Sequence, residues 1–114
     1  MNIVIVGTGY VGLVTGVGLA ELGNTVTFID LDTEKIKKLK NKELPFFEPD
    51  LDKYFSKIEN FERMSFHSNY EDLNWDIVEV VFICVQTPNN TKTNSVDTKF
   101  LESAISKIAE LNKE

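Results

Sequence analysis

The chain has 114 residues, of which 42% are hydrophobic, and its formal charge is −6. This composition suits one globular domain with a modest core and excludes a disordered chain. The acidic balance argues against a nucleic-acid partner, and the sequence has no apolar run near the ~20 residues that span a membrane. One cysteine, Cys84, allows no internal disulfide and favours a cytoplasmic location.

The first part of the sequence alternates strand and helix patterns. β-Branched residues dominate its opening run, which is typical of a strand buried on both faces. Gly23 suits the position just beyond the end of the first helix. The expected elements are a strand at 2–6, a helix at 10–22, a strand at 25–30 and a second helix that runs to about Lys40. Asp32 or Thr33 can cap this second helix, and Ile36 and Leu39 are expected to face inward.

The second part begins with ELPFFEPD, in which two prolines break regular structure. The expected elements are a short helix at 51–58, a strand at 63–67, a brief helical turn at 70–73, a strand at 77–85, a polar loop over TPNNTKTNS, and a final helix that Asp97 caps. That helix carries one apolar stripe made of Phe100, Leu101, Ala104, Ile105, Ile108 and Leu111.

This order predicts an α/β fold of the Rossmann-like, doubly wound kind, with a mostly parallel sheet and helices on both faces. A final helix in such a fold leads into another parallel strand, which this sequence lacks. We therefore expect residues 1–114 to form one incomplete domain, and the alternative is a complete small domain. An open sheet edge would allow pairing with a second copy, so a homo-oligomer is also an expectation.

All six glycines lie between Gly7 and Gly23. Gly7, Gly9 and Gly12 spell G-x-G-x-x-G where the first strand meets the first helix. In a dinucleotide-binding unit the first permits a tight turn, the second lets a pyrophosphate approach the backbone, and the third lets the helix pack closely. Gly16 and Ala20 continue the small-residue stripe from Gly12. The alternative is a close-packed turn that binds nothing.

Asp30 ends the second strand, close to the ~20-residue spacing at which an acid binds the ribose of a dinucleotide. Its charge would repel a 2′-phosphate, which favours NAD over NADP. The alternative is an acid that only ends a strand and caps the next helix. Lys35 lies one turn further and can reach the same ligand. His67 has no ligand partners nearby in sequence, so we expect a structural role and no metal site, and we expect Cys84 to be an inert buried thiol.

Four stretches, GTGYVGLVTGVGLAELG, FIDLDTEKI, LPFFEPDL and VVFICVQTP, resemble the N-terminal NAD-binding domain of the UDP-glucose 6-dehydrogenase family, within the UDP-glucose/GDP-mannose dehydrogenases. The resemblance runs in the same order and spacing from Met1 to about Leu111. It implies NAD as the cofactor. The cofactor-binding residues it implies are Gly7, Gly9, Tyr10, Val11, Gly12, Asp30, Lys35 and, in the VQTP stretch, Thr87.

The same resemblance implies that the whole protein oxidises the C6 alcohol of a nucleotide sugar to a carboxylate with two NAD molecules. It places that activity in cytoplasmic nucleotide-sugar metabolism, which serves polysaccharide biosynthesis. The family's catalytic cysteine lies in a downstream segment that this sequence lacks, as does the region that contacts the sugar substrate. No catalytic residue is therefore assigned here, and the chain alone is expected to be inactive.

Two alternatives stay open. The parent protein can oxidise GDP-mannose or an N-acetylated UDP-sugar, or the chain can be a non-catalytic dinucleotide-binding fragment. The sequence also departs from the family pattern, because Asp50 stands where glycine is usual and Gln86 where proline or asparagine is commoner. Asp50 leaves the conformation of the FFEPDL turn in question.

Overall fold

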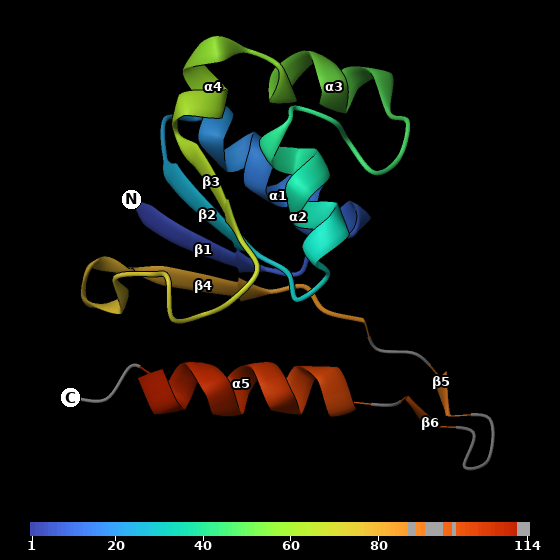
Figure 1. The fold of residues 1–114 in the computed structure, drawn as a ribbon, viewed down its shortest axis with the longest axis vertical. Coiled ribbons are helices and arrows are strands. Elements are labelled where there is room, and N and C mark those ends of the chain that lie inside the picture. The colour runs from blue at the N-terminus through green and yellow to red at the C-terminus, as the bar shows by residue number, and fades with distance from the viewer. Residues whose placement is uncertain (87–88, 91–94, 97, 112–114) are drawn as a thin grey trace.

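The computed structural model describes residues 1–86, 89–90, 95–96 and 98–111 (Figure 1). Four parallel strands form its main sheet in the order β3-β2-β1-β4. The strands are β1 (Asn2–Val6), β2 (Thr25–Ile29), β3 (Met64–His67) and β4 (Val80–Ile83). This order is that of the first four strands of a doubly wound dinucleotide-binding sheet.

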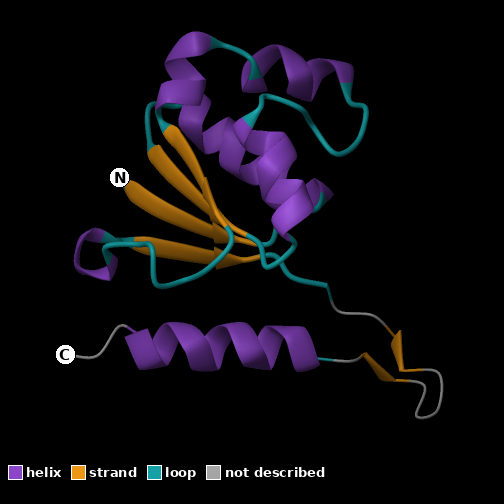
Figure 2. Cartoon of the chain, viewed as in Figure 1, coloured by secondary structure: helices purple, strands orange, loops and turns teal. Residues whose placement is uncertain are grey.

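Helices cover both faces of the sheet (Figure 2). Four of them lie on one side: α1 (Tyr10–Glu21), α2 (Thr33–Lys40), α3 (Pro49–Phe55) and α4 (Ile58–Glu62). The fifth, α5 (Lys99–Leu111), lies on the opposite side. The prediction of a doubly wound parallel sheet with helices on both faces is confirmed.

The strand β1 joins the two halves of the core. Ile3 and Ile5 belong to the cluster beneath α1 to α4, whereas Val4 and Val6 belong to the cluster on the α5 side. All four side chains are buried, because successive residues of a strand point to opposite faces. The β-branched run at the start of the chain is therefore explained by burial on two faces.

The small-residue stripe of α1 lets this helix lie directly on the sheet. A Cβ added at Gly16 would overlap the ring of Phe28, a fully buried side chain of β2. That ring also stacks on Phe66 of β3, with the ring centroids 5.1 Å apart, so it has little room to yield. A Cβ at Gly18, on the outer side of the helix, would meet nothing within 4 Å.

Several predicted boundaries in the second part of the chain are wrong. The predicted helix at 51–58 is two helices, α3 and α4, and the predicted helical turn at 70–73 is a turn without a helix. A 3₁₀ helix, η1, occupies Trp75–Ile77 instead. The predicted strand at 77–85 therefore shrinks to Val80–Ile83. The apolar run before it is explained by packing, since Val78 contacts the α5-side cluster without belonging to a strand.

The predicted polar loop contains two short strands, β5 (Asn89–Asn90) and β6 (Ser95–Val96), which pair antiparallel as a separate two-stranded sheet. Asp97, the predicted cap of the last helix, lies outside the described residues. The apolar stripe of α5 is only partly covered: Ala104 is buried, but Phe100 is 47% exposed and Ile105 is 51% exposed. The predicted apolar stripe lies on α5 as expected, and the sheet buries only part of it.

Alanine substitutions at Gly16 and Gly18 test the packing of α1. Both changes raise helix propensity equally, so their difference isolates the cost of forcing a methyl group against Phe28. We expect the free energy of unfolding of Gly16→Ala to lie about 1–3 kcal/mol below that of Gly18→Ala, as for other overpacked cores. Urea denaturation followed by circular dichroism measures both values, and equal stabilities would contradict the close approach of α1.

Candidate functional site

The candidate site lies where the carboxyl ends of the parallel strands meet the first turn of α1. Gly7 leaves β1 with φ +102°, a conformation that side chains rarely adopt. Its N–H donates to the carbonyl oxygen of Ile29 at 2.7 Å, which ties the turn to the end of β2. A Cβ at Gly7 would also lie 2.5 Å from the carbonyl oxygen of Cys84, just beyond β4. Both the turn and its neighbours therefore require glycine.

Gly12 and Gly9 differ in what surrounds them. A Cβ at Gly12 would overlap the carbonyl oxygen of Gly7, so this glycine brings α1 onto the turn. Gly9 has an ordinary φ of −76°, and a Cβ there would meet nothing within 4 Å. The protein's own packing gives no reason for glycine at this position. Open space beside Gly9 is what a ligand pressed against the main chain would need.

The first turn of α1 offers hydrogen-bond donors to that space. Gly9 is the N-cap and supplies no side-chain acceptor, and the first turn contains no acidic residue. Among the described residues, none accepts a hydrogen bond from the backbone N–H of Tyr10 or Val11. Such free donors at the positive end of a helix dipole favour a phosphate.

The side chains of Tyr10 and Val11 take no part in the turn itself. The Tyr10 ring packs on Phe46 with a centroid separation of 5.5 Å, and the Val11 side chain is 63% exposed. The predicted contribution of these two residues is therefore a main-chain one. The structure places both where their N–H groups border the open side of the turn.

Asp30 follows β2 directly, beside the glycine turn. Its Oδ2 accepts hydrogen bonds from the Thr8 N–H at 2.9 Å and from the Thr8 hydroxyl at 2.6 Å. Its Oδ1 accepts one from the Asp32 N–H at 2.9 Å. The short hydroxyl contact is typical of a donor bound to a charged carboxylate. The side chain of Asp30 is thus held at the site in a single orientation.

Thr8 is the residue that sequence reasoning missed. It is fully buried, yet it occupies a variable position of the glycine motif. The register of the parallel pair β1 and β2 could have identified it. Val6 pairs with Ile29, so the residues just after these strands lie side by side. In a parallel pair, Thr8 and Asp30 are then neighbours across the ends of the strands.

Lys35 lies in the first turn of α2, and Asp32 caps this helix. The Asp32 carboxylate accepts from the N–H of Glu34 at 3.1 Å and of Lys35 at 3.2 Å. Asp30 is therefore not needed as the cap, which weakens the alternative interpretation of that residue. The Lys35 side chain is half-buried, and no carboxylate in the described part of the chain lies within ion-pair distance of it.

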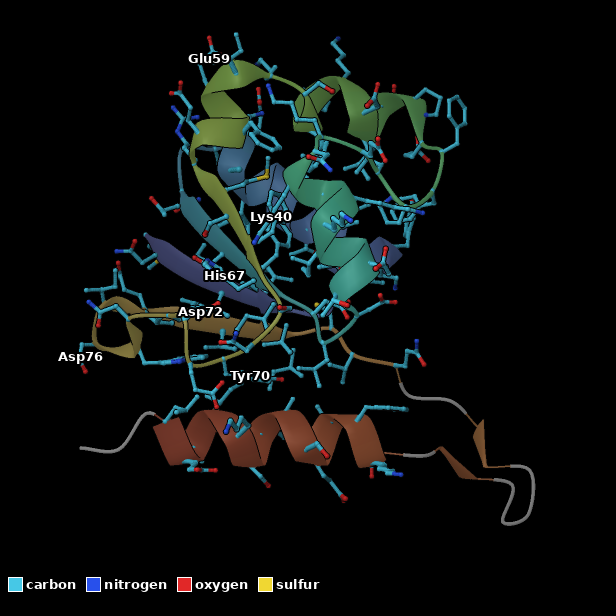
Figure 3. All side chains as sticks on the ribbon, in the orientation of Figure 1. Lys40, Glu59, His67, Tyr70, Asp72 and Asp76 are labelled. Carbon is cyan, nitrogen blue, oxygen red and sulfur yellow. The ribbon has the colours of Figure 1, made fainter. Side chains whose placement is uncertain are left out.

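Tyr70 reaches this region from the α5 side (Figure 3). Burial raises the pKa of its phenol, and the nearby carboxylate of Asp30 raises it further. Its backbone carbonyl accepts a hydrogen bond from the Trp75 indole N–H at 2.8 Å, which fixes the segment after β3. The charge of Asp30 thus acts on the Tyr70 phenol and favours its protonated form.

His67, at the end of β3, has a structural position. Its Nδ1 lies 3.6 Å from Oδ2 of Asp72 on the following turn, and its carbonyl oxygen accepts from the Asp30 N–H at 3.1 Å (Figure 3). No group of three or more potential metal ligands occurs among the residues that the structure describes. His67 thus helps to place Asp30 through the main chain.

Two other predicted residues have different outcomes. Cys84 lies just beyond β4, where burial raises the pKa of its thiol and disfavours the reactive thiolate. Thr87, the predicted cofactor contact after β4, lies outside the described residues. The Asp50 question is settled by α3: Pro49 stands at its start and Asp50 in its first turn, where an acid is favourable and glycine is not required.

The comparisons with known proteins agree with this geometry. Within the described residues, no helix is long and apolar enough to cross a membrane. The family model described as the UDP-glucose/GDP-mannose dehydrogenase family, NAD binding domain, matches residues 1–114. A UDP-glucose 6-dehydrogenase of Rickettsia bellii is 43% identical over 115 residues, which cover 100% of this chain and 26% of that protein.

Solved structures show the same likeness. The GDP-mannose dehydrogenase of Pseudomonas aeruginosa, solved as a ternary complex, matches with a TM-score of 0.85 and 30% identity over 95% of this chain and 24% of that one. The UDP-D-ManNAc dehydrogenase of Pyrococcus horikoshii matches with a TM-score of 0.85 and 33% identity over 96% and 25%. The chain thus spans about a quarter of the length of these relatives.

Three observations agree. A glycine turn lies at the N-terminus of α1, an acid is held beside that turn, and the family model matches the whole sequence. The chain belongs to the UDP-glucose/GDP-mannose dehydrogenase family, in which it corresponds to the NAD-binding domain.

Proposed function

We propose that the chain binds NAD at this site as the cofactor-binding part of a nucleotide-sugar dehydrogenase. The pyrophosphate lies against the main chain of Gly9 and the free N–H groups of Tyr10 and Val11. A ribose hydroxyl of the adenosine half donates to Asp30. The observation that carries the proposal is the open space at Gly9 beside a carboxylate whose orientation Thr8 already holds.

The charges around Asp30 support NAD rather than NADP. A 2′-phosphate would meet the carboxylate of Asp30, and Asp32 adds a second negative charge two residues on. Arg63, the only arginine of the chain, binds the carbonyl oxygen of Ala20, at the opposite end of α1 from the glycine turn. Lys35, in the first turn of α2, is proposed to approach the same part of the cofactor, and Thr87, which follows β4 in the sequence, is proposed to contact it.

For the whole protein we propose oxidation of UDP-glucose to UDP-glucuronate with two NAD molecules, in the cytoplasm and in the service of polysaccharide biosynthesis. The support is the identity with UDP-glucose 6-dehydrogenases such as the one from Rickettsia bellii. GDP-mannose or an N-acetylated UDP-sugar is the second candidate, favoured by the two solved relatives named above. The sugar is proposed to bind outside residues 1–114, and self-association remains a proposal based on the open edge of β4.

The first test of this function is the variant Asp30→Ala. Loss of a hydrogen bond to a charged group costs about 1.5–3 kcal/mol, so we expect NAD to bind about 10- to 100-fold more weakly. Nuclear magnetic resonance titration of the isotope-labelled chain with NAD measures the dissociation constant. Asp76→Ala is the matched control, because this acid is exposed and lies at the other end of the sheet (Figure 3). Unchanged affinity in Asp30→Ala would remove the ribose assignment.

The second test concerns catalysis by the chain alone. We expect no increase in the absorbance of NADH, followed at ~340 nm, when NAD and UDP-glucose are added to the chain. The chain has one thiol, Cys84, and burial raises its pKa, so it is a poor nucleophile. Sustained NADH production that depends on UDP-glucose would show that residues 1–114 are catalytically sufficient.

A further inference from the structure

We infer that Thr8 is a positioning residue that limits Asp30 to a single ribose hydroxyl, so that the adenosine ribose is recognised at one hydroxyl and not at both. This inference rests on the proposed function, because it concerns how NAD is held at the same site. Neither the sequence motif nor the family match assigns a role to Thr8.

The argument begins with the acceptor capacity of the Asp30 carboxylate. An ionised carboxylate has about four positions at which it accepts hydrogen bonds, two on each oxygen. Thr8 fills both positions on Oδ2, one with its N–H at 2.9 Å and one with its hydroxyl at 2.6 Å. The Asp32 N–H fills one position on Oδ1. In the described part of the chain no further donor reaches this carboxylate, so one acceptor position on Oδ1 is left for a ligand.

The Thr8 side chain is well suited to hold this arrangement. It is fully buried, so its hydroxyl has no water to bind in place of Asp30. The adjacent Gly7 is tied to β2 by its hydrogen bond to Ile29, and the Asp30 N–H is tied to the His67 carbonyl on β3. Both partners are thus attached to the sheet, and the carboxylate cannot turn to offer Oδ2 without breaking two hydrogen bonds.

A vicinal diol can donate two hydrogen bonds to a carboxylate only if both oxygens have a free position. At this site the second ribose hydroxyl must therefore find another partner or remain in water. Removing the hydroxyl that Asp30 binds leaves an acceptor position empty, whereas removing the other leaves Asp30 unaffected. The two hydroxyls should consequently differ in how strongly they couple to Asp30.

Two deoxy forms of NAD, lacking either the 2′- or the 3′-hydroxyl of the adenosine ribose, test this difference. Their affinities are measured for the unmodified chain and for Asp30→Ala by the same titration. We expect one deoxy form to lose about tenfold in affinity in the unmodified chain and almost none in Asp30→Ala. The other should lose the same factor, within about twofold, in both proteins.

Coupling of both hydroxyls to Asp30, each by about tenfold, would overturn the inference while leaving NAD binding intact. Failure of NAD itself to shift the resonances of the glycine turn would instead overturn the proposed function. Circular dichroism of Asp30→Ala checks that this variant is folded, and the Thr8 variants described next test the inference without it.

Variants of Thr8 test the positioning role separately. Thr8→Val keeps the shape but removes the hydroxyl, and we expect NAD to bind about three- to tenfold more weakly. Thr8→Ser restores the hydroxyl and should bind NAD within about twofold of the unmodified chain, although loss of the buried methyl lowers its thermal stability. Thr15→Val, a change of the same kind further along α1, is the control. Full affinity in Thr8→Val, or weakened affinity in both Thr8→Val and Thr8→Ser, would overturn the positioning role.

Discussion

The close approach of α1 to the end of β1 is the contact on which the rest of the structure depends. Gly12 has no side chain because the carbonyl oxygen of Gly7 occupies that space, and Gly16 has none because the ring of Phe28 does. Two glycines thus set the height of a helix above a sheet. The same contact aims the first N–H groups of α1 along the edge where the strands end. A helix raised by one methyl group would no longer bring its N-terminus to that edge.

The second consequence of the turn is electrostatic. The N-terminus of α1 carries partial positive charge and favours an anion, while Asp30 places a fixed negative charge beside it. Because Thr8 binds Asp30 through both its N–H and its hydroxyl, the carboxylate is held short of the first turn of α1 and does not cap it. The donors of that turn stay free for a phosphate. A chain with an acid inside the first turn of α1 would neutralise its own site.

The two sides of the sheet differ in how completely they are covered. The side of α1 to α4 holds the larger cluster, with Phe28 and Phe55 fully buried. On the other side, α5 is attached through Ala104 and through an ion pair of 2.7 Å between Lys107 and Glu71, which lowers the pKa of that glutamate. Exposed ion pairs contribute little stability, so this side depends on a smaller apolar contact. Phe82 of β4, 38% exposed, lies at the open edge of the sheet. The relatives are about four times as long as this chain.

The sequence by itself determined the βαβ unit from β1 to β2 and the start of α2, because strong local signals coincide there: a β-branched run, the spaced glycines, and an Asx cap at Asp32. It also predicted that Asp30 stands at the end of the second strand, because this position depends only on where that strand ends. Tertiary structure alone decided the rest. Ile77 and Val78 fit a strand pattern, but both lie outside the sheet: Val78 packs against the α5-side cluster and Ile77 is exposed. An apolar run of this length does not show which neighbour, if any, buries each residue. Thr8 is the clearest case. Its partner, Asp30, follows a different strand, so the two residues meet only when the parallel register brings the ends of β1 and β2 together.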